Sequence, residues 1–272
     1  MPYARKSGVL VLAALASLFA PSIASAQPSF VADGDFSICV DPTFPPMEYK
    51  ENASDATPVG VDVEVTNALA EQWGAKASFI TMDFNGLLPS LQAGRCDAII
   101  SGITLTAERQ KTFDGVGYLN TFIVIIANAG APALKGPEDL AGKTIAVQSG
   151  TTYLARMEKL NETLTANGLE PMILQQYPKQ TDAIQQLQVG RVLGVVTQDT
   201  EVAFREFQDP GKFSTIWRVP QDAVEPYAIY IQKNETDKAE VQKAVTALLS
   251  SGKLREIVDK WKLSPDQLEG IQ

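Results

Sequence analysis

The chain has 272 residues, with 23 Lys or Arg side chains against 32 Asp or Glu, which gives a net charge of −9 at pH 7. Such an acidic surface is a poor partner for nucleic acid or for an anionic membrane. The chain contains no histidine, which removes the usual general base, the Ser-His and Cys-His nucleophile pairs and the commonest zinc ligand. Hydrolases are therefore disfavoured.

The first 26 residues have the layout of a secretory signal peptide. Two basic residues precede an apolar run over residues 9–20, and an Ala-Ser-Ala triplet ends at Ala26. This pattern predicts cleavage after Ala26, before Gln27. The run is too short for a permanent membrane span, and no later stretch has the required length. We therefore expect a mature protein that is exported and soluble.

Strand and helix patterns alternate after this segment. They predict strands at residues 36–41, 77–82 and 97–101, a helix at 63–73 and a short helix at 86–92. Alternation of this kind is typical of a doubly wound α/β sheet, in which ligands bind at the carboxyl ends of the strands.

A second series of the same kind begins after Asn120. It predicts strands at 122–128, 144–148, 172–176, 194–198 and 227–232, helices at 153–167 and 181–189, and two amphipathic helices between 238 and 261. The strand at 144–148 leads into hydroxyl and glycine residues, as the strand at 97–101 does. Two similar series predict two α/β lobes.

The segment from Ser101 to Arg109, SGITLTAER, has the features of an anion-binding site. It follows the apolar residues 98–100 and leads into a polar, helix-capable stretch. Hydroxyls and free backbone N–H groups at such a turn face one point, where the helix dipole adds partial positive charge. The Arg109 guanidinium would then hold a carboxylate with two hydrogen bonds. The alternative is an ordinary turn in which Thr104 or Thr106 caps the helix and Arg109 forms a surface ion pair.

The two cysteines, Cys39 and Cys96, could form a disulfide in an oxidising compartment. Each lies in an apolar, strand-like run. If these strands are parallel and aligned at Asp41 and Ser101, the cysteines are offset by about three residues, roughly 10 Å. That separation exceeds the Cα distance that a disulfide tolerates, so we expect two buried thiols.

Five ordered stretches resemble the family 3 periplasmic solute-binding proteins, the receptors of polar amino-acid ABC importers. They are VDPTFPPMEY (40–49), GVDVEVTNALAEQWG (60–74), DFNGLLPSLQAGRCDAIISGITLTAERQKTFD (83–114), LAGKTIAVQSGTTY (140–153), and PYAIYIQKN with LREIVDKW (226–234 and 254–261). The resemblance covers essentially the whole mature length. It implies a monomeric periplasmic protein that needs no cofactor or metal, binds an amino acid or similar carboxylate and passes it to a membrane-embedded ABC permease.

The resemblance also implies the fold, that of the type II periplasmic binding proteins. Two doubly wound α/β lobes are joined by two hinge strands and close on one ligand. We expect residues 27–120 and 225–272 in the first lobe and residues 121–224 in the second.

By the same resemblance, Arg109 takes the ligand α-carboxylate in a two-pronged pair. The backbone N–H of Thr104 assists it, together with Thr151 or Thr152 from the other lobe. Charge-assisted hydrogen bonds of this kind contribute about 1.5 to 3 kcal/mol each.

Other positions of the resemblance concern the rest of the ligand. Ser101 and Gly102 stand where the family offers a hydroxyl and a carbonyl to the α-ammonium. Phe44 and Phe84 stand where the ligand side chain is sandwiched, although both could be ordinary core aromatics. The polar residues that close strands and point at the cleft are Asp41 and Gln148.

The chain departs from the family at the strand before residue 199. The family commonly has GRVDAVVTD, whose final Asp pairs with the ligand ammonium, but this chain has GRVLGVVTQD at 190–199. Counting without gaps places Gln198 at the acid position and Asp199 one residue later, on the other face of the strand. Either a bulge returns Asp199 to the cleft, or neutral acceptors hold the ammonium, or the ligand lacks a free α-ammonium, in which case Asp199 fits as a helix N-cap. Losing the partner of a buried ammonium is costly, which favours an ordinary amino acid.

Two other functional classes remain open. One is an enzyme on the same scaffold, similar to the periplasmic cyclohexadienyl or arogenate dehydratases, with Glu48, Glu225 or Asp199 as its acid. Otherwise we expect Glu48 to be a solvated charge or a support that does not touch the ligand. The other class is a signalling module like the ligand-binding lobes of sensor kinases. A chain that ends at Gln272 without a membrane span disfavours it.

Overall fold

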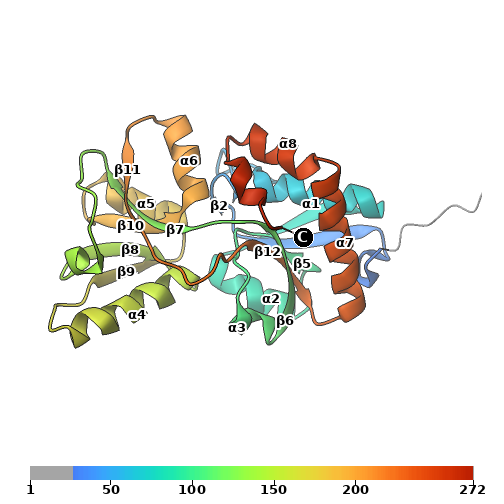
Figure 1. The fold of residues 1–272 in the computed structure, drawn as a ribbon. Helices are drawn as coiled ribbons and strands as arrows, with labels where there is room; N and C mark the ends of the chain where they lie inside the picture. Colours follow the sequence, from blue (N-terminus) through green and yellow to red (C-terminus); the bar gives the residue numbers. More distant parts are fainter. Residues whose placement is uncertain (1–26, 272) are drawn as a thin grey trace, which may run out of the picture.

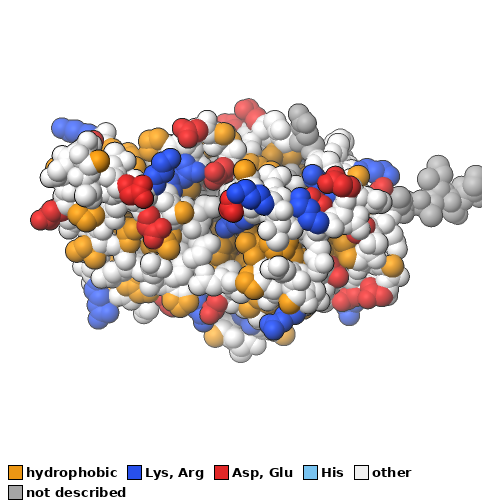
Figure 2. All heavy atoms as spheres, turned by 90° about the horizontal axis from the view of Figure 1, so that it is seen from below, with side chains coloured by type: hydrophobic (Ala, Val, Ile, Leu, Met, Phe, Trp, Pro, Cys, Tyr) orange, Lys and Arg blue, Asp and Glu red, His pale blue; other side chains and the backbone are white. Residues whose placement is uncertain are grey.

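The computed structural model describes residues 27–271, so the expected signal peptide lies outside the described residues. Two lobes lie side by side along the molecule (Figure 1), and each is built on a five-stranded sheet. None of the helices within residues 27–271 combines the length and apolar character of a membrane span. Acidic and basic side chains are interspersed over both lobes on the face seen in Figure 2.

The sheet of the first lobe has the strand order β4-β1-β5-β12-β6. Its strands are β1 (Asp35–Val40), β4 (Lys76–Thr81), β5 (Ala98–Ile99), β6 (Phe113–Leu119) and β12 (Tyr227–Gln232). Strand β1 runs parallel to β4 and β5, whereas β12 is antiparallel to β5 and β6.

Helices cover both faces of this sheet. One face packs on α1 (Val61–Trp73), α7 (Glu235–Ser250) and α8 (Lys253–Lys260), and the other on α2 (Leu87–Gln92). Because successive residues of a strand point to opposite faces, Ile38 and Cys39 enter two separate apolar cores. This is the doubly wound arrangement that the alternating pattern predicts.

The second lobe repeats this plan with the strand order β11-β7-β10-β8-β9. Its strands are β7 (Ile123–Asn128), β8 (Thr144–Gln148), β9 (Ile173–Tyr177), β10 (Gly194–Gln198) and β11 (Phe213–Arg218). Strand β8 is parallel to β9 and β10, and β7 is antiparallel to β10 and β11. Apolar residues of α4 (Thr152–Ala166) and α5 (Gln180–Gln188) fill two separate cores, and α6 (Asp199–Gln208) packs against β10 and β11.

Two chain segments join the sheets: residues 120–122 between β6 and β7, and residues 219–226 between β11 and β12 (Figure 1). After β12 the chain stays with the first lobe, and the short 3₁₀ helix η4 (Pro265–Leu268) packs at the first of these segments. Asn120 N donates to Gln267 O there over 2.7 Å. The C-terminal end of the chain therefore supports the connection between the lobes.

Several elements were not predicted from the sequence. They are the two-residue strands β2 (Thr43–Phe44) and β3 (Glu48–Tyr49) and the strands β6 and β11, whereas the helix α6 was expected only in the alternative that makes Asp199 an N-cap. Strand β6, FDGVGYL, contains two glycines, which weaken a strand pattern. Gly115 is needed there because an added Cβ would lie 2.9 Å from a ring carbon of Tyr230 on β12. Helix α6 begins at Asp199 immediately after β10, so no loop residues mark its start.

The expectation of two free thiols is wrong, because Cys39 and Cys96 form a disulfide with their Cα atoms 5.7 Å apart. The assumed alignment is right, since Cys39 pairs with Ile99 in the parallel β1–β5 ladder. The error lies in extending β5 backwards as a straight strand. Strand β5 begins only at Ala98, and residues 93–97 form turns and bends, which bring Cys96 back beside β1.

Candidate ligand-binding site

The carboxyl ends of the parallel strands of both sheets meet at the junction of the lobes. Asp41 follows β1, Gln148 ends β8, and both side chains are buried. Gln148 Nε2 donates to Asp41 Oδ2 over 2.7 Å. The backbones also approach closely, because a Cβ added at Gly150 would lie 1.9 Å from Asn85 Oδ1 of the first lobe. The lobes are therefore in contact in this structure.

A cleft of about 490 Å³ opens between the lobes beside this contact. It is bordered by residues of the first lobe that include Asp41, Met82 and Asp83, and by Lys179 and Asp182 of the second lobe. Of the predicted site residues, Asp41 borders this cleft.

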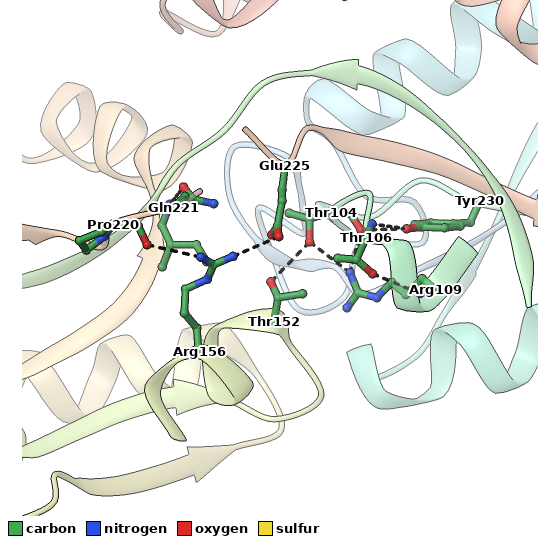
Figure 3. Close-up of polar contacts among 10 residues, drawn as sticks. Thr104, Thr106, Arg109, Thr152, Arg156, Pro220, Gln221, Glu225 and Tyr230 are labelled. Atoms are coloured by element: carbon green, nitrogen blue, oxygen red, sulfur yellow. Dashed lines mark hydrogen bonds and ion pairs between the residues drawn. The ribbon is translucent and has the colours of Figure 1, made fainter. Parts of the chain in front are cut away.

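Arg109 lies in the short helix α3 (Ala107–Gln110), which Thr106 caps by accepting a hydrogen bond from Arg109 N over 3.2 Å. The guanidinium turns back, and its Nη1 donates to Thr104 O over 2.9 Å and to Thr104 Oγ1 over 3.2 Å (Figure 3). Within residues 27–271 its geometric hydrogen bonds are those of Nη1 alone, and the Tyr230 hydroxyl lies beside the guanidinium. The guanidinium also lies 6.0 Å from the ring centre of Phe84. Burial lowers the pKa of Arg109, but an arginine remains charged.

Thr104 presents a free donor beside this guanidinium. It bridges to Tyr227 of β12 through Ile103 O and Leu105 N, so its own N–H points away from that strand and has no acceptor among the described residues. The Tyr230 hydroxyl donates to Thr104 O over 3.0 Å and so holds the loop in place. A cation with unused donors and a free backbone N–H together can bind a carboxylate.

Ser101 is held within the first lobe. Its hydroxyl accepts from Asp41 N over 2.9 Å and donates to Glu48 Oε1 over 3.0 Å. Glu48 is fully buried, so the expectation of a solvated charge is wrong and the other alternative, a support, fits. Gly102 N donates to Asp62 Oδ2 over 2.7 Å, and the Tyr118 hydroxyl donates to Asp62 Oδ1.

Burial governs the protonation of these carboxyls. It raises the pKa of Asp41 and of Asp62 from 3.8 to about 6 in each case. Burial and the neighbouring Asp62 raise the pKa of Glu48 well above its usual range. The closeness of Glu48 to Asp62 was not predicted, because the two residues lie on segments that no local sequence pattern links.

The two aromatic residues have different surroundings. Phe44 is 5% exposed, belongs to the core and lies against Gly102, where an added Cβ would be 2.7 Å from its ring. Gly102 also has a φ of 52°, which favours glycine. Phe84 is half-buried and stacks near Arg109. Phe44 therefore packs as a core residue, whereas Phe84 borders the guanidinium.

The start of α4 brings second-lobe hydroxyls to the first lobe. Thr152 Oγ1 lies 3.4 Å from Thr104 Oγ1 across the junction (Figure 3). Thr151 is buried, and its hydroxyl donates to Gln148 O over 2.7 Å, which fixes the turn after β8. Thr152 thus faces the loop that carries Thr104 and Arg109, and Thr151 stabilises the turn from which Thr152 projects.

Gln198 closes β10 and is fully buried. Its Oε1 accepts from the Tyr153 hydroxyl over 2.5 Å, whereas its Nε2 has no partner among the described residues. Tyr153 was not singled out from the sequence, although it follows Thr152 directly and ends the stretch that carried the resemblance.

Asp199 points toward the segment that joins the lobes and not toward the surroundings of Gln198. Strand β10 pairs with β7 up to Gln198 without a register shift, so no bulge turns Asp199 inward. Its carboxylate accepts from the Thr121 hydroxyl at 2.8 Å, from Phe122 N at 3.1 Å and from Gln267 Nε2 at 3.3 Å. Asp199 therefore anchors the segment that joins the lobes.

One further ion pair lies at the junction. Arg156 of α4 donates from Nη2 to Glu225 Oε1 over 3.0 Å (Figure 3). Glu225 belongs to the second joining segment, and its Oε2 is buried without a hydrogen-bond partner among the described residues. The charge of Glu225 also acts on Arg109, whose pKa it raises against the larger effect of burial. No local pattern could have predicted this pair.

The sequence and the fold are similar to those of known solute-binding proteins. The family model of the bacterial extracellular solute-binding proteins, family 3, matches residues 36–264. The L-arginine-binding protein of Pseudomonas aeruginosa is 30% identical over 241 residues, which cover 86% of this chain and 90% of that protein. The crystal structure of the substrate-binding protein of an amino acid ABC transporter has a TM-score of 0.72 and 32% identity, covering 84% of this chain and 99% of that one. An ancestral arginine-binding protein bound to arginine has a TM-score of 0.72 and 28% identity, with 84% and 98% covered.

Proposed function

Because this chain belongs to family 3 of the bacterial extracellular solute-binding proteins, we propose that it is an exported receptor that captures an amino acid or amino-acid-like carboxylate between its lobes. The captured solute is then delivered to an ABC importer. The relatives named for arginine binding make that amino acid one candidate.

The observation that carries this proposal is the geometry around Arg109. Among the described residues its geometric hydrogen bonds are those of Nη1 alone, and the free N–H of Thr104 lies on the same loop. The side chain of Arg109 is half-buried, so its unused donors have lost part of their hydration, which is a cost. A ligand carboxylate supplies two charge-assisted bonds and removes this cost.

Closure of the lobes couples capture to a change of shape. The contacts from Gln148 to Asp41 and from Thr152 to Thr104 join the two lobes. A solute that bridges Arg109 and the start of α4 binds the closed form better than the open form, so it shifts the population toward closure.

The remaining parts of the proposal concern place and partner. We propose that residues 1–26 direct export to the periplasm and that the receptor acts as a monomer. The closed form would dock on a membrane-embedded ABC permease, which opens the lobes and releases the solute.

We further propose that binding occurs without chemical change. Glu48 is buried beneath Ser101, and Asp199 is bound to the joining segment. Neither carboxyl is free to act as an acid on a solute held by Arg109, and the third candidate, Glu225, is engaged by Arg156 in an ion pair over 3.0 Å. Incubation with prephenate or arogenate should therefore yield no product.

Calorimetric titration with polar and basic amino acids, including L-arginine, and with related carboxylates tests the proposal. Wild type should bind at least one, and Arg109→Ala should lose about a hundredfold or more in affinity, as expected from two charge-assisted bonds. Arg255→Ala serves as the matched control, because Arg255 is exposed on α8. Arg109→Ala affinity within threefold of wild type, in a variant that unfolds like wild type, would overturn the proposal.

A further inference from the structure

The side chain of Gln198 presents an unused hydrogen-bond donor in a fully buried position. Its Oε1 is occupied by the Tyr153 hydroxyl at 2.5 Å, and its Nε2 has no partner within residues 27–271. A buried donor without a partner is destabilising, because it has lost its hydrogen bonds to water without gaining others. Such a group calls for an acceptor from outside the chain.

Tyr153 fixes which atom of the amide is free. The Tyr153 hydroxyl is buried, and burial raises its pKa well above the usual range, so it keeps its proton. Gln198 Oε1 is the acceptor for that proton. Rotating the amide by half a turn would leave the phenol proton without an acceptor among the described residues. The orientation with Nε2 free therefore satisfies one more group.

Gln198 and Tyr153 belong to the same junction of the lobes as Arg109 and Thr104, the proposed carboxylate site. Tyr153 directly follows Thr152, whose hydroxyl lies 3.4 Å from that of Thr104. The charges of Arg109 and Glu48, both in the first lobe, act on the Tyr153 phenol. Tyr153 and its partner Gln198 therefore lie on the side of the junction from which Thr152 reaches the loop that carries Arg109.

Most carboxyl oxygens of the first lobe around this junction already accept hydrogen bonds, but Glu48 Oε2 is buried without a partner among the described residues. Asp41 accepts from Gln148 and from Thr43, and Asp62 accepts from Gly102 N and the Tyr118 hydroxyl. Glu48 accepts from Ser101, and burial beside Asp62 favours its neutral form. A free ammonium would find few anionic acceptors there. Besides Glu48 Oε2, Glu225 Oε2 is unpartnered, and the charge of Glu225 acts on Arg109.

We propose that the solute of this site carries a hydrogen-bond acceptor in place of a free α-ammonium, and that Gln198 Nε2 donates to it. The chemical class is a 2-hydroxy or 2-oxo carboxylic acid, with its carboxylate on Arg109. This inference rests on the proposed function of the same site and narrows its ligand.

Matched compounds test it. Leucine, phenylalanine, glutamine and arginine are each titrated calorimetrically against the 2-hydroxy and 2-oxo acids with the same side chain. For the side chain that binds best, wild type should prefer the hydroxy or oxo acid to the amino acid by about tenfold or more, because an ammonium faces a donor there. This comparison needs no variant, so it holds even if a substitution impairs folding.

Two variants assign the preference to Gln198. Gln198→Glu keeps the acceptor for Tyr153 and replaces the free donor by an anionic oxygen, so the preference should reverse toward the amino acid. Tyr153→Phe frees Gln198 Oε1 from its hydrogen bond, so the amide can rotate. The difference in affinity between the hydroxy or oxo acid and the amino acid should then become smaller. Gln185→Glu adds the same charge at an exposed position of α5 and should leave the preference unchanged.

The outcomes separate this inference from the proposed function. Tighter wild-type binding of the amino acids would overturn the inference; if Arg109→Ala abolishes that binding, the proposed function stands. If Glu225→Gln then removes the preference for amino acids, it is Glu225 rather than Gln198 that contacts the α-substituent of the ligand. Binding of none of these compounds by folded protein would overturn both.

Discussion

Gln148 of the second lobe donates to Asp41 of the first over 2.7 Å, and both side chains are buried. This bond joins the ends of β8 and β1, the positions at which parallel α/β sheets place ligand chemistry. Asp41 Oδ1 also accepts from the Thr43 hydroxyl over 2.9 Å. Closure therefore removes the Asp41 carboxyl from water, and its ionisation becomes linked to the folded, closed form.

The first prediction concerns pH. Burial raises the pKa of Asp41 from 3.8 to about 6, so the folded protein holds this proton more tightly than the unfolded chain. The stabilising contribution is complete below pH 4 and is lost as the pH rises to about 6. Asp41→Asn cannot titrate. The free energy of unfolding of wild type relative to Asp41→Asn should therefore fall by roughly 2 to 3 kcal/mol between pH 4 and pH 7.

Urea unfolding at several pH values measures this difference. Wild-type and Asp41→Asn curves of unfolding free energy that stay parallel from pH 4 to pH 7 would contradict it. Asp62, whose pKa is also raised to about 6 by burial, remains in both proteins, so its contribution cancels in the comparison.

The second prediction concerns the close approach at Gly150. An added Cβ would lie 1.9 Å from Asn85 Oδ1 and 3.1 Å from its Cγ, and the φ of Gly150 is +76°. Gly150→Ala should hold the lobes apart, increase the radius of gyration with ligand present and weaken binding. Small-angle X-ray scattering and calorimetry measure the two effects.

Gly168→Ala is the matched control, because Gly168 has the same φ of +76° but no atom within 4 Å of an added Cβ. Both variants should lose roughly 1 kcal/mol of stability from the backbone, whereas only Gly150→Ala should fail to compact. The double variant Gly150→Ala with Asn85→Ala should compact again. Normal compaction of Gly150→Ala alone would show that Asn85 simply turns aside.

The third prediction separates Asp199 from the ligand. Its carboxylate accepts hydrogen bonds from Thr121, Phe122, Thr200 and Gln267. Asp199→Ala leaves several of these donors without a partner and should cost about 2 to 3 kcal/mol of unfolding free energy. Ligand affinity at a temperature where the variant is folded should stay within threefold of wild type. A loss of tenfold or more with unchanged stability would place Asp199 in the site after all.

Local patterns account for much of the fold and for the turn that places Arg109 in the short helix α3. Strands β8, β10 and β12 were predicted at their observed bounds, because each is a short apolar run that ends at a polar residue. The turn before Arg109 was also predicted, since a Thr at an N-cap and an arginine in the first helical turn are sequence-local features.

What the sequence could not supply is contact between distant segments. Glu48 and Ser101 are 53 residues apart, and Arg156 and Glu225 are 69 apart. Each residue alone looks like a surface charge or a turn residue. The disulfide was missed for a related reason, because the bend before β5 that returns Cys96 to β1 is set by packing rather than by strand geometry.

The last prediction concerns closure at the start of α4. Thr152 Oγ1 lies 3.4 Å from Thr104 Oγ1, which in turn accepts from Arg109 Nη1. Thr152→Val keeps the shape of the side chain but removes its hydroxyl, so the second lobe loses a polar contact with the loop that we propose to hold the ligand carboxylate. Ligand should still bind through Arg109, about five- to tenfold more weakly, as expected for one lost hydrogen bond.

The matched control is Thr163→Val, an exposed position on the same helix, which removes an equal group without touching the junction. Calorimetry should show weaker binding for Thr152→Val alone, and small-angle X-ray scattering should show that this variant compacts less at saturating ligand. If Thr152→Val and Thr163→Val compact alike and bind alike, the Thr152 hydroxyl takes no part in closure. Closure would then depend on the bond between Gln148 and Asp41, which Gln148→Leu would test by the same two measurements.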